Sequence, residues 1–430
     1  MQITLLTYGS RGDVQPYLAL ALGLQHSGHT VRLAAPERFA GLAESFGIPF
    51  AALAGDPQVI SARMNDAGTN AWRTVRAIQE YVFGIAGQVV RQARTALLGA
   101  DLVVHSFLFT TGAHSFAREL GIPDVSVQTF PIFAPTCAFP NVALAGLPVG
   151  PLSFLSHWFA TQVFWHGGNR GYARLRREAP AEFPAQLFWP FRKVDGRPIT
   201  PLLIAVSPTI LPRPREWSTA SVHQPGSFFL DEPGYAPEPS LQTFLDAGEA
   251  PVCVSFGSMV HRDAERIGHA VLEALASTGR RGLLLTGWGG WRPDPLPRSV
   301  FAVEAAPHGW LLPRCAAVIH HGGAGTTAAG LRAGRPNIVV PFTADQPFWA
   351  GRIAALGAGP QPLPVRRMDA GRLAAAIERA LTDEGILRRA AQVGAAIRAE
   401  QGVNLAVRLI EAAADSFRQG HVGQATAPGA

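Results

Sequence analysis

Two successive series of short apolar runs, each run followed by a helical pattern, constrain the fold of this 430-residue chain more than any other feature. Strands that alternate with helices are typical of a parallel sheet covered on both faces, because each parallel connection must cross over the sheet. The sequence therefore predicts an α/β protein with two Rossmann-like, doubly wound parallel-sheet domains that face each other across a cleft. The runs lie at residues 3–8, 30–35, 48–53, 101–106 and 124–129, and then at 251–256, 281–286, 299–304, 316–321 and 337–342.

A proline-rich passage at residues 207–226 separates the two series and predicts the connection between the domains. Ligands of such sheets bind beyond the carboxyl ends of the strands, so we expect the site residues just after each strand. The predicted parts are an N-terminal domain, a linker, a C-terminal domain, a helix that packs back on the N-terminal domain, and a flexible tail, at residues 1–212, 213–226, 227–395, 396–417 and 418–430.

The composition excludes several classes of protein. Hydrophobic residues make up 47% of the chain and charged residues 16%, which allows a large core and argues against disorder. The net charge is +6, but Lys193 is the only lysine and the arginines are scattered, so no nucleic-acid partner is expected. Three distant cysteines predict neither disulfides nor a zinc site. With no signal-peptide or membrane-spanning pattern, we expect a cytoplasmic protein.

A glycine-rich loop at residues 320–327, "HHGGAGTT", follows one strand and begins a helix. Glycines allow a ligand to approach the backbone, and the helix N-terminus offers free N–H donors and partial positive charge, so the loop predicts a phosphate site. Thr326 and Thr327 can add hydroxyl donors, and His320 or His321 can donate a ring N–H. The loop lacks the lysine of a P-loop and the spacing of a dinucleotide fingerprint. A plain glycine turn with two buried histidines would give the same pattern.

Two further loops follow strands of the same predicted sheet. Asp345 and Gln346 come after the run at 337–342, and a carboxylate beside an amide suits the hydroxyl groups of a sugar. The segment "SFGSM" at residues 255–259 adds Gly257 and Ser258 at the same edge. A phosphate site beside a hydroxyl-binding pair predicts a nucleotide sugar as the ligand.

The loop after the first strand holds the equivalent position in the N-terminal domain. In "YGSRGDVQP", residues 8–16, the glycines bend the chain and Asp13 falls at the start of the next helix, which we expect to have Pro16 in its first turn. Asp13 is either an N-cap carboxylate or a general base that faces the cleft, and both roles can hold together. His105 ends the fourth strand and could share a proton with Asp13, or it could have a purely structural backbone partner.

Aromatic residues are dense between Phe130 and Phe191. They indicate either an apolar pocket for a lipophilic acceptor such as a sterol, hopanoid, polyketide or lipid, or a well-packed set of helices. The segment "FLSHWFATQVFW", residues 154–165, also has the composition of a surface that contacts a membrane.

Four segments together resemble the family 1 glycosyltransferases of the GT-B fold. They are "GSRGDVQPYLALALGLQHSGHTV", "SFGSM", "PHGWLLPRCAAVIHHGGAGTTAAGLRAGRP" and "PFTADQPFWA", and the resemblance is strongest to the sterol 3-beta-glucosyltransferase and bacterial natural-product branch. The resemblance implies an inverting transfer from a nucleotide sugar, usually UDP-glucose, to a hydroxyl group, without a metal ion or a resident cofactor.

The resemblance also implies roles for individual residues. Asp13 is the implied base with His105 as its partner, and Asp345 with Gln346 binds the sugar. The implied diphosphate-binding residues are His320, Gly322, Gly323, Gly325, Thr326 and Thr327, and the donor site also includes Gly9, Ser10, Arg11, Gly12, Gly257, Ser258 and His308.

The segment "AAPHGW" departs from the family pattern. Related plant enzymes have a tryptophan that stacks on uracil, followed by Pro-Gln, whereas Ala305, Pro307 and His308 stand at the matching positions here. The choice between a UDP-sugar and a TDP-deoxysugar therefore stays open, as do the acceptor and the oligomeric state. The sequence is also compatible with a nucleotide-sugar epimerase or hydrolase of the same build, and with a catalytically silent relative that activates a partner enzyme.

Overall fold

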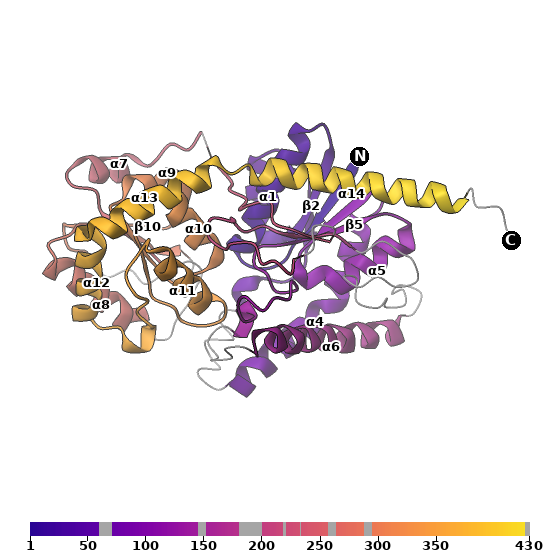
Figure 1. Ribbon diagram of the computed structural model, residues 1–430, viewed down its shortest axis with the longest axis horizontal. Helices are drawn as coiled ribbons and strands as arrows, with labels where there is room; N and C mark the ends of the chain where they lie inside the picture. Colours follow the sequence, from indigo (N-terminus) through magenta and orange to yellow (C-terminus); the bar gives the residue numbers. More distant parts are fainter. Residues whose placement is uncertain are drawn as a thin grey trace.

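A computed structural model describes residues 1–59, 71–144, 152–179, 200–217, 221–232, 234–256, 264–287 and 295–425. These residues form two α/β units side by side (Figure 1). The first contains a seven-stranded sheet of order β3-β2-β1-β4-β5-β6-β7, and the second a five-stranded sheet of order β10-β9-β8-β11-β12. Every strand pair is parallel, which confirms the predicted fold class.

The first unit contains the seven strands of the larger sheet and the helices that cover it. Its elements in the described residues are β1 (Gln2–Leu6), α1 (Arg11–His26), β2 (Thr30–Pro36), η1 (Glu37–Phe39), α2 (Ala40–Ser45), β3 (Phe50–Leu53), α4 (Ala71–Ala96), β4 (Leu102–His105), η2 (Phe107–Phe109), α5 (Thr110–Leu120), β5 (Asp124–Gln128), η3 (Val142–Leu144), α6 (Ser153–Glu178), β6 (Leu202–Ile204) and β7 (Val222–His223).

The second unit follows, and the chain then returns to the first. The remaining described elements are α7 (Pro239–Asp246), β8 (Val252–Ser255), α8 (Ala264–Ser277), β9 (Gly282–Leu285), β10 (Val300–Val303), α9 (His308–Leu311), η6 (Leu312–Arg314), β11 (Ala317–His320), α10 (Ala324–Arg332), β12 (Asn337–Val339), α11 (Gln346–Leu356), η7 (Val365–Arg367), α12 (Ala370–Thr382), α13 (Glu384–Ala399) and α14 (Gly402–Ala425).

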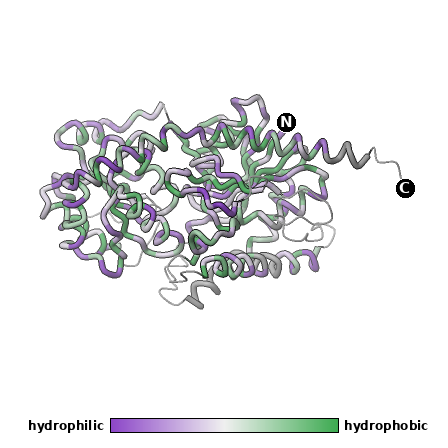
Figure 2. Tube along the Cα trace, in the orientation of Figure 1, coloured by the Kyte–Doolittle hydropathy of each residue, from purple (hydrophilic) through white to green (hydrophobic). Residues whose placement is uncertain are grey.

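Alternation along each strand decides which side of the sheet a residue faces. In β4, Val104 belongs to the core that α1 covers, whereas Val103 belongs to the core beside α4 and α5. Both faces of this sheet are apolar because helices cover both. Figure 2 shows the green, hydrophobic stretches of these strands in the interior.

The last helix ties the two units together. In Figure 1, α14 crosses from the second unit over α1 of the first. Ala406, Ile410 and Ala414 are buried in the same core as the α1 leucines. The helix continues to Ala425, beyond the end at residue 417 that the sequence predicted.

A second apolar cluster lies where the units meet. The Phe139 ring lies 5.3 Å from the Phe348 ring, and Trp217 and Trp349 are buried in the same cluster. Residues 222–223, which the sequence placed in the linker, instead form β7 at the edge of the larger sheet. The connection is therefore partly integrated into the first unit, which limits how freely the units can separate.

Candidate functional site

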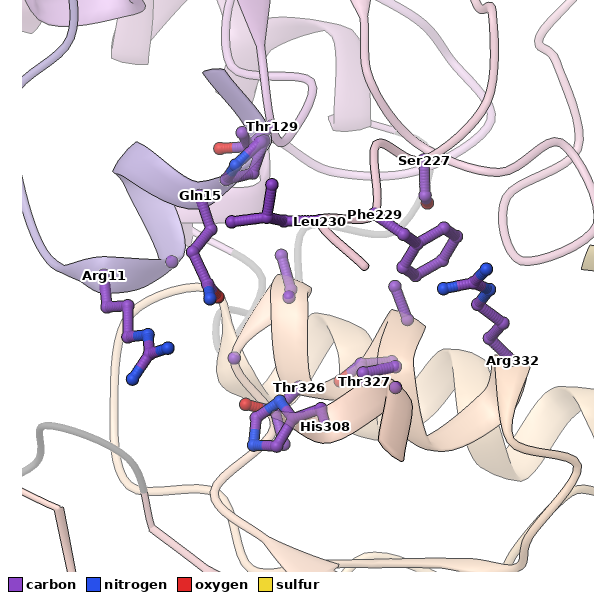
Figure 3. A pocket seen from close by; sticks show the side chains of 18 of the residues that line it. Arg11, Gln15, Thr129, Ser227, Phe229, Leu230, His308, Thr326, Thr327 and Arg332 are labelled. Atoms are coloured by element: carbon purple, nitrogen blue, oxygen red, sulfur yellow. The ribbon is translucent and has the colours of Figure 1, made fainter. Parts of the chain in front are cut away.

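A cavity of about 940 Å³ lies between the carboxyl ends of the two sheets. It is lined by the start of α1, the segment after β5, residues 228–232, the start of α10 and the loop before α11. In Figure 3, Arg11 and Gln15 of α1 face His308, Thr326 and Thr327 of the second unit across this space. The loops that the sequence singled out in each domain therefore line one cavity.

Asp13 lies in the first turn of α1, and its position corrects the predicted start of this helix. The helix begins at Arg11, so Pro16 lies inside it and Asp13 is three residues after the N-cap, Ser10. The backbone N–H of Ser10 donates to Asp13 Oδ2 at 2.7 Å, and the Ser10 hydroxyl donates to the same oxygen at 3.0 Å. This capping box fixes the carboxylate at the cavity wall.

The electrostatic environment of Asp13 favours the protonated form more than water does. Burial raises the pKa of the Asp13 carboxyl above its ordinary value, although the two hydrogen bonds from Ser10 oppose the shift. Gly9, at φ +139°, is needed here, because a Cβ at this position would lie 2.3 Å from Asp13 Oδ2. A carboxylate with a raised pKa is a better general base than one at an ordinary helix N-terminus.

Asp345 is the second carboxylate of the cavity. Burial raises the pKa of the Asp345 carboxyl to about 6, and the charge of Asp13 adds a small further rise. The hydrogen bond that Trp349 Nε1 donates to Asp345 Oδ2 at 2.7 Å and a backbone hydrogen bond oppose this shift. Its neighbour Gln346 also lines the cavity, but Gln346 Oε1 accepts from the backbone N–H groups of Phe342 and Thr343 at 2.8 and 3.1 Å. The Gln346 carbonyl thus braces the loop that presents Asp345.

His320 does not hold the role that the family resemblance implied. It is completely buried at the end of β11 and is not part of the cavity wall. Its Nε2 lies 2.9 Å from Asn337 Oδ1, and its Nδ1 accepts from the backbone N–H of Gly322 at 3.1 Å. Burial lowers its pKa to about 3. Both ring nitrogens are engaged within the protein, so this neutral ring supports the glycine loop and has no N–H to give a phosphate.

His321 is the histidine that reaches the cavity. Within the described residues its Nδ1 has no hydrogen-bond partner, and burial lowers its pKa to about 4 against a hydrogen bond with the Ser255 backbone. The ring is therefore neutral at pH 7, and its single N–H serves either the Ser255 backbone or a bound ligand. Gly322, the next residue, has φ +90°, and a Cβ there would meet Val339 at 2.8 Å. This tight glycine turn follows the strand directly, so the chain turns toward the cavity.

The first turn of α10 presents an anion site. Its N-cap is Gly323, and the N–H groups that follow have no partner within the helix. The hydroxyl of Thr327 is fully buried and, among the described residues, has no hydrogen-bond partner. Gly325 and Thr326 also line the cavity. The arrangement offers donors to a diphosphate without a lysine.

Arg11 adds a permanent positive charge opposite this turn. It lies at the cavity wall, 3.7 Å from the carboxylate of Glu232. His308 faces it from α9, and burial together with the charge of Arg11 lowers the pKa of His308 to about 4. Ser10 and Gly12 line the same wall, whereas Gly257 and Ser258 lie outside the described residues. Arg11 is thus one of three arginines that line the cavity, with Arg332 and Arg398, whereas His308 and His321 are neutral donors or acceptors.

Comparisons with known proteins identify the family of this chain. Residues 3–97 match the glycosyltransferase family 28 N-terminal domain, and residues 292–409 match the erythromycin biosynthesis protein CIII-like C-terminal domain. The chain is 39% identical over 440 residues to O-mycaminosyltylonolide 6-deoxyallosyltransferase of Streptomyces fradiae, covering 98% of this chain and 99% of that protein. The chain is a GT-B glycosyltransferase of the sterol and natural-product branch.

Further relatives differ in length or sequence. A sterol 3-beta-glucosyltransferase of Cryptococcus neoformans is 34% identical over 95% of this chain, which spans only 27% of the fungal protein. The solved kitacinnamycin glycotransferase has a TM-score of 0.70 at 20% identity and covers 96% of this chain and 99% of its own, so it supports the fold.

In this glycosyltransferase, His105 is not the partner of Asp13. It is fully buried, and its Nε2 lies 3.1 Å from Asp124 Oδ2. The same carboxylate lies 3.0 Å from His114 Nδ1, and its pKa is held well below the usual range because the two histidines outweigh the effect of burial. His105 shares the sheet face of Val103, covered by α5, whereas α1 carries Asp13 on the opposite face. Strand alternation from Val104 could have revealed this, because it places the two residues on opposite sides.

The aromatic region of this glycosyltransferase divides into packed and exposed parts. The Phe107 and Phe130 rings lie 5.2 Å apart, and those of Phe133 and Phe164 lie 5.9 Å apart. Phe130 also lines the cavity. Much of the described region therefore forms a packed layer, and the predicted aromatics between residues 180 and 199 lie outside the described residues.

Proposed function

We propose that the chain transfers a hexose, with inversion, from a UDP-sugar (UDP-glucose in the first instance) to a hydroxyl of a lipophilic acceptor such as a sterol, hopanoid or polyketide. The observation that supports this most is one cavity with two opposed walls. A carboxylate of raised pKa, Asp13, stands on one wall, and the free N–H groups of the α10 N-terminus stand on the other.

The leaving diphosphate would lie against the start of α10. Its backbone N–H groups, the Thr327 hydroxyl, the His321 ring and the Arg11 guanidinium supply donors where negative charge develops. These groups balance the charge of the leaving group, so in this proposal the nucleotide sugar is the only cosubstrate and neither a metal ion nor a resident cofactor is used.

Asp13 would remove the proton of the acceptor hydroxyl as that oxygen attacks the anomeric carbon. The proton goes to the Asp13 carboxylate, and the C–O bond to the diphosphate breaks on the opposite face of the sugar. Phe130, which lines the same cavity, offers an apolar contact for the acceptor. Asp345 would accept hydrogen bonds from sugar hydroxyls, held in place by Trp349 and by the loop that Gln346 braces.

Replacement of the base tests the proposal directly. Asp13→Asn should lower turnover by roughly 10²–10⁴-fold, because general-base catalysis contributes about that much. Binding of UDP, measured by calorimetry, should stay within about threefold, since Asp13 lies on the acceptor wall. Normal turnover in this variant would reject the assignment of Asp13. A reaction with donor but no acceptor is the control for an epimerase or hydrolase, which would consume the nucleotide sugar alone. All reactions should contain no partner protein, because turnover that requires a partner would indicate the catalytically silent relative.

A second candidate donor is a TDP-6-deoxyhexose. It is favoured by the likeness over nearly the whole length to a 6-deoxyallosyltransferase. UDP- and TDP-linked sugars should therefore be compared at equal concentration with sterol and macrolide acceptors, with products detected by mass spectrometry. A kcat/KM at least tenfold higher for one nucleotide would assign the donor.

A further inference from the structure

The outward side of α6 is apolar over its first three turns. Six residues here are each more than half exposed: Leu152, Phe154, Leu155, Trp158, Phe159 and Val163, at 57, 51, 55, 60, 53 and 53%. Soluble proteins commonly expose single apolar residues, but a contiguous group of this kind marks an interaction surface. We call these six residues the α6 apolar face. Figure 1 shows α6 along the outer edge of the first unit, and Figure 2 shows hydrophobic residues along it.

The inward side of the same turns carries Ala160 and three polar residues that form hydrogen bonds. Ser153, Ser156 and His157 are buried, and the backbone N–H of Asn141 donates to Ser156 Oγ at 2.8 Å. His157 Nε2 bonds to the carbonyl of Phe139 at 3.0 Å. This is the reverse of an ordinary surface helix, which turns its apolar side inward. Because the buried polar groups are paired, a rotation of the helix that turned the apolar residues inward would break those hydrogen bonds.

The charges of α6 favour an anionic surface. From Leu152 to Glu178 the chain contains four arginines and one acidic residue, Glu178, whose carboxylate lies 2.9 Å from Arg174 Nε. Arg176 and Arg177 follow Trp158 and Phe159 by 18 residues, which is five helical turns, so both pairs lie on one side of the helix about 27 Å apart. Both arginines are exposed. A helix laid flat on a bilayer would place the aromatic residues among the headgroups and the arginines against the phosphates.

We propose that the α6 apolar face docks this protein on the surface of an anionic phospholipid bilayer. Within the described residues, no helix is both long and apolar enough to cross a membrane. The α6 apolar face spans about 18 Å at 1.5 Å per residue, so it would lie in the interface, parallel to the membrane. The proposal uses no residue of the donor cavity, so docking and sugar transfer can each fail without the other.

The test is sedimentation with lipid vesicles. The full chain should bind vesicles of phosphatidylcholine with about 30% phosphatidylglycerol, whose surface potential is negative, and bind pure phosphatidylcholine much more weakly. Phe154→Ser combined with Trp158→Ser and Phe159→Ser should lower the partition coefficient by about tenfold or more, because three exposed side chains would no longer enter the interface. Arg176→Gln with Arg177→Gln should lower it by about fivefold for each arginine at low ionic strength.

Leu98→Ser is the matched control, since Leu98 is 59% exposed on the same unit and lies outside α6. It should leave vesicle binding unchanged, and all variants should keep the wild-type affinity for UDP or TDP, which verifies folding. The proposal is overturned if the wild-type chain binds neither vesicle, or if the triple variant binds as well as the wild type. It is also overturned if sedimentation velocity shows a dimeric wild-type chain and a monomeric triple variant, because the α6 apolar face would then be a dimer interface.

Discussion

Two strand-end histidines, one in each unit, differ in what they bind and teach the same rule. His105 ends β4 and His320 ends β11, and both are completely buried and outside the cavity wall. His105 contacts the carboxylate of Asp124, whereas His320 contacts the neutral amide of Asn337. A histidine whose backbone is still paired in the sheet forms its side-chain hydrogen bonds inside the protein. The residue that lines the cavity is the next one along the chain, as His321 shows in the second unit.

The largest effect expected from this comparison is at His321. His321→Ala should lower kcat by about 10²-fold or more, because one donor to the leaving diphosphate is lost. The unfolding midpoint should change little, since the ring is only half-buried and its Nδ1 has no partner in the described part of the chain. Steady-state kinetics and thermal unfolding measure the two effects. An unaltered kcat would show that the His321 ring does not bind the leaving diphosphate.

The next effect concerns stability. Asp124→Asn leaves His105 and His114 without their carboxylate and should lower the free energy of unfolding by about 3 kcal/mol at pH 7. Because the folded-state pKa of Asp124 is lowered, its contribution is present above its unfolded pKa of about 4 and is lost as the pH falls below that value. Denaturant unfolding at pH 7 and pH 3 should therefore show a smaller difference between wild type and variant at pH 3.

Nucleotide affinity separates this cluster from the active site. In the folded Asp124→Asn variant the dissociation constant for UDP or TDP should stay near the wild-type value, because Asp124 lies on the far face of the sheet from the cavity. A large loss of affinity in folded protein would instead connect this cluster to the cleft.

Sequence periodicity sufficed for the sheets and for the loops that meet at the cleft, because parallel strands end at a common edge. Periodicity did not suffice where single residues determine the end of an element or which side chain lines the cavity. The Ser10–Asp13 capping box starts α1 at Arg11, five residues before Pro16. Short strands such as β6 and β7 contain too few residues to show an alternating pattern. The choice between His320 and His321 depended on sheet pairing that continues through His320 to Ser255 and Val339. No local pattern specifies where that pairing stops.

The smallest predicted effect tests how His320 supports the loop. Its neutral ring accepts the Gly322 N–H, and with a pKa near 3 it stays neutral at every pH used for assay. Asn337→Asp places a carboxylate beside Nε2, which raises the pKa of the ring and favours imidazolium. Imidazolium cannot accept from Gly322, so the loop should loosen as the pH falls. We expect the variant to bind nucleotide up to about twofold more weakly at pH 6 than at pH 8, because an adjacent carboxylate raises a pKa by at most about 3 units, which leaves the ring about half protonated at pH 6.

Asn337→Ala is the control for that charge. Both variants lose the bond that Asn337 Nδ2 donates to the carbonyl of Arg335, so both weaken the loop in the same way. Only the aspartate can stabilise a proton on His320. The alanine variant should therefore bind more weakly by the same factor at pH 6 and pH 8, after correction for the wild-type pH response. Equal pH dependence in the two variants would mean that the protonation state of His320 does not set the position of Gly322, and the parallel with His105 would reduce to burial alone.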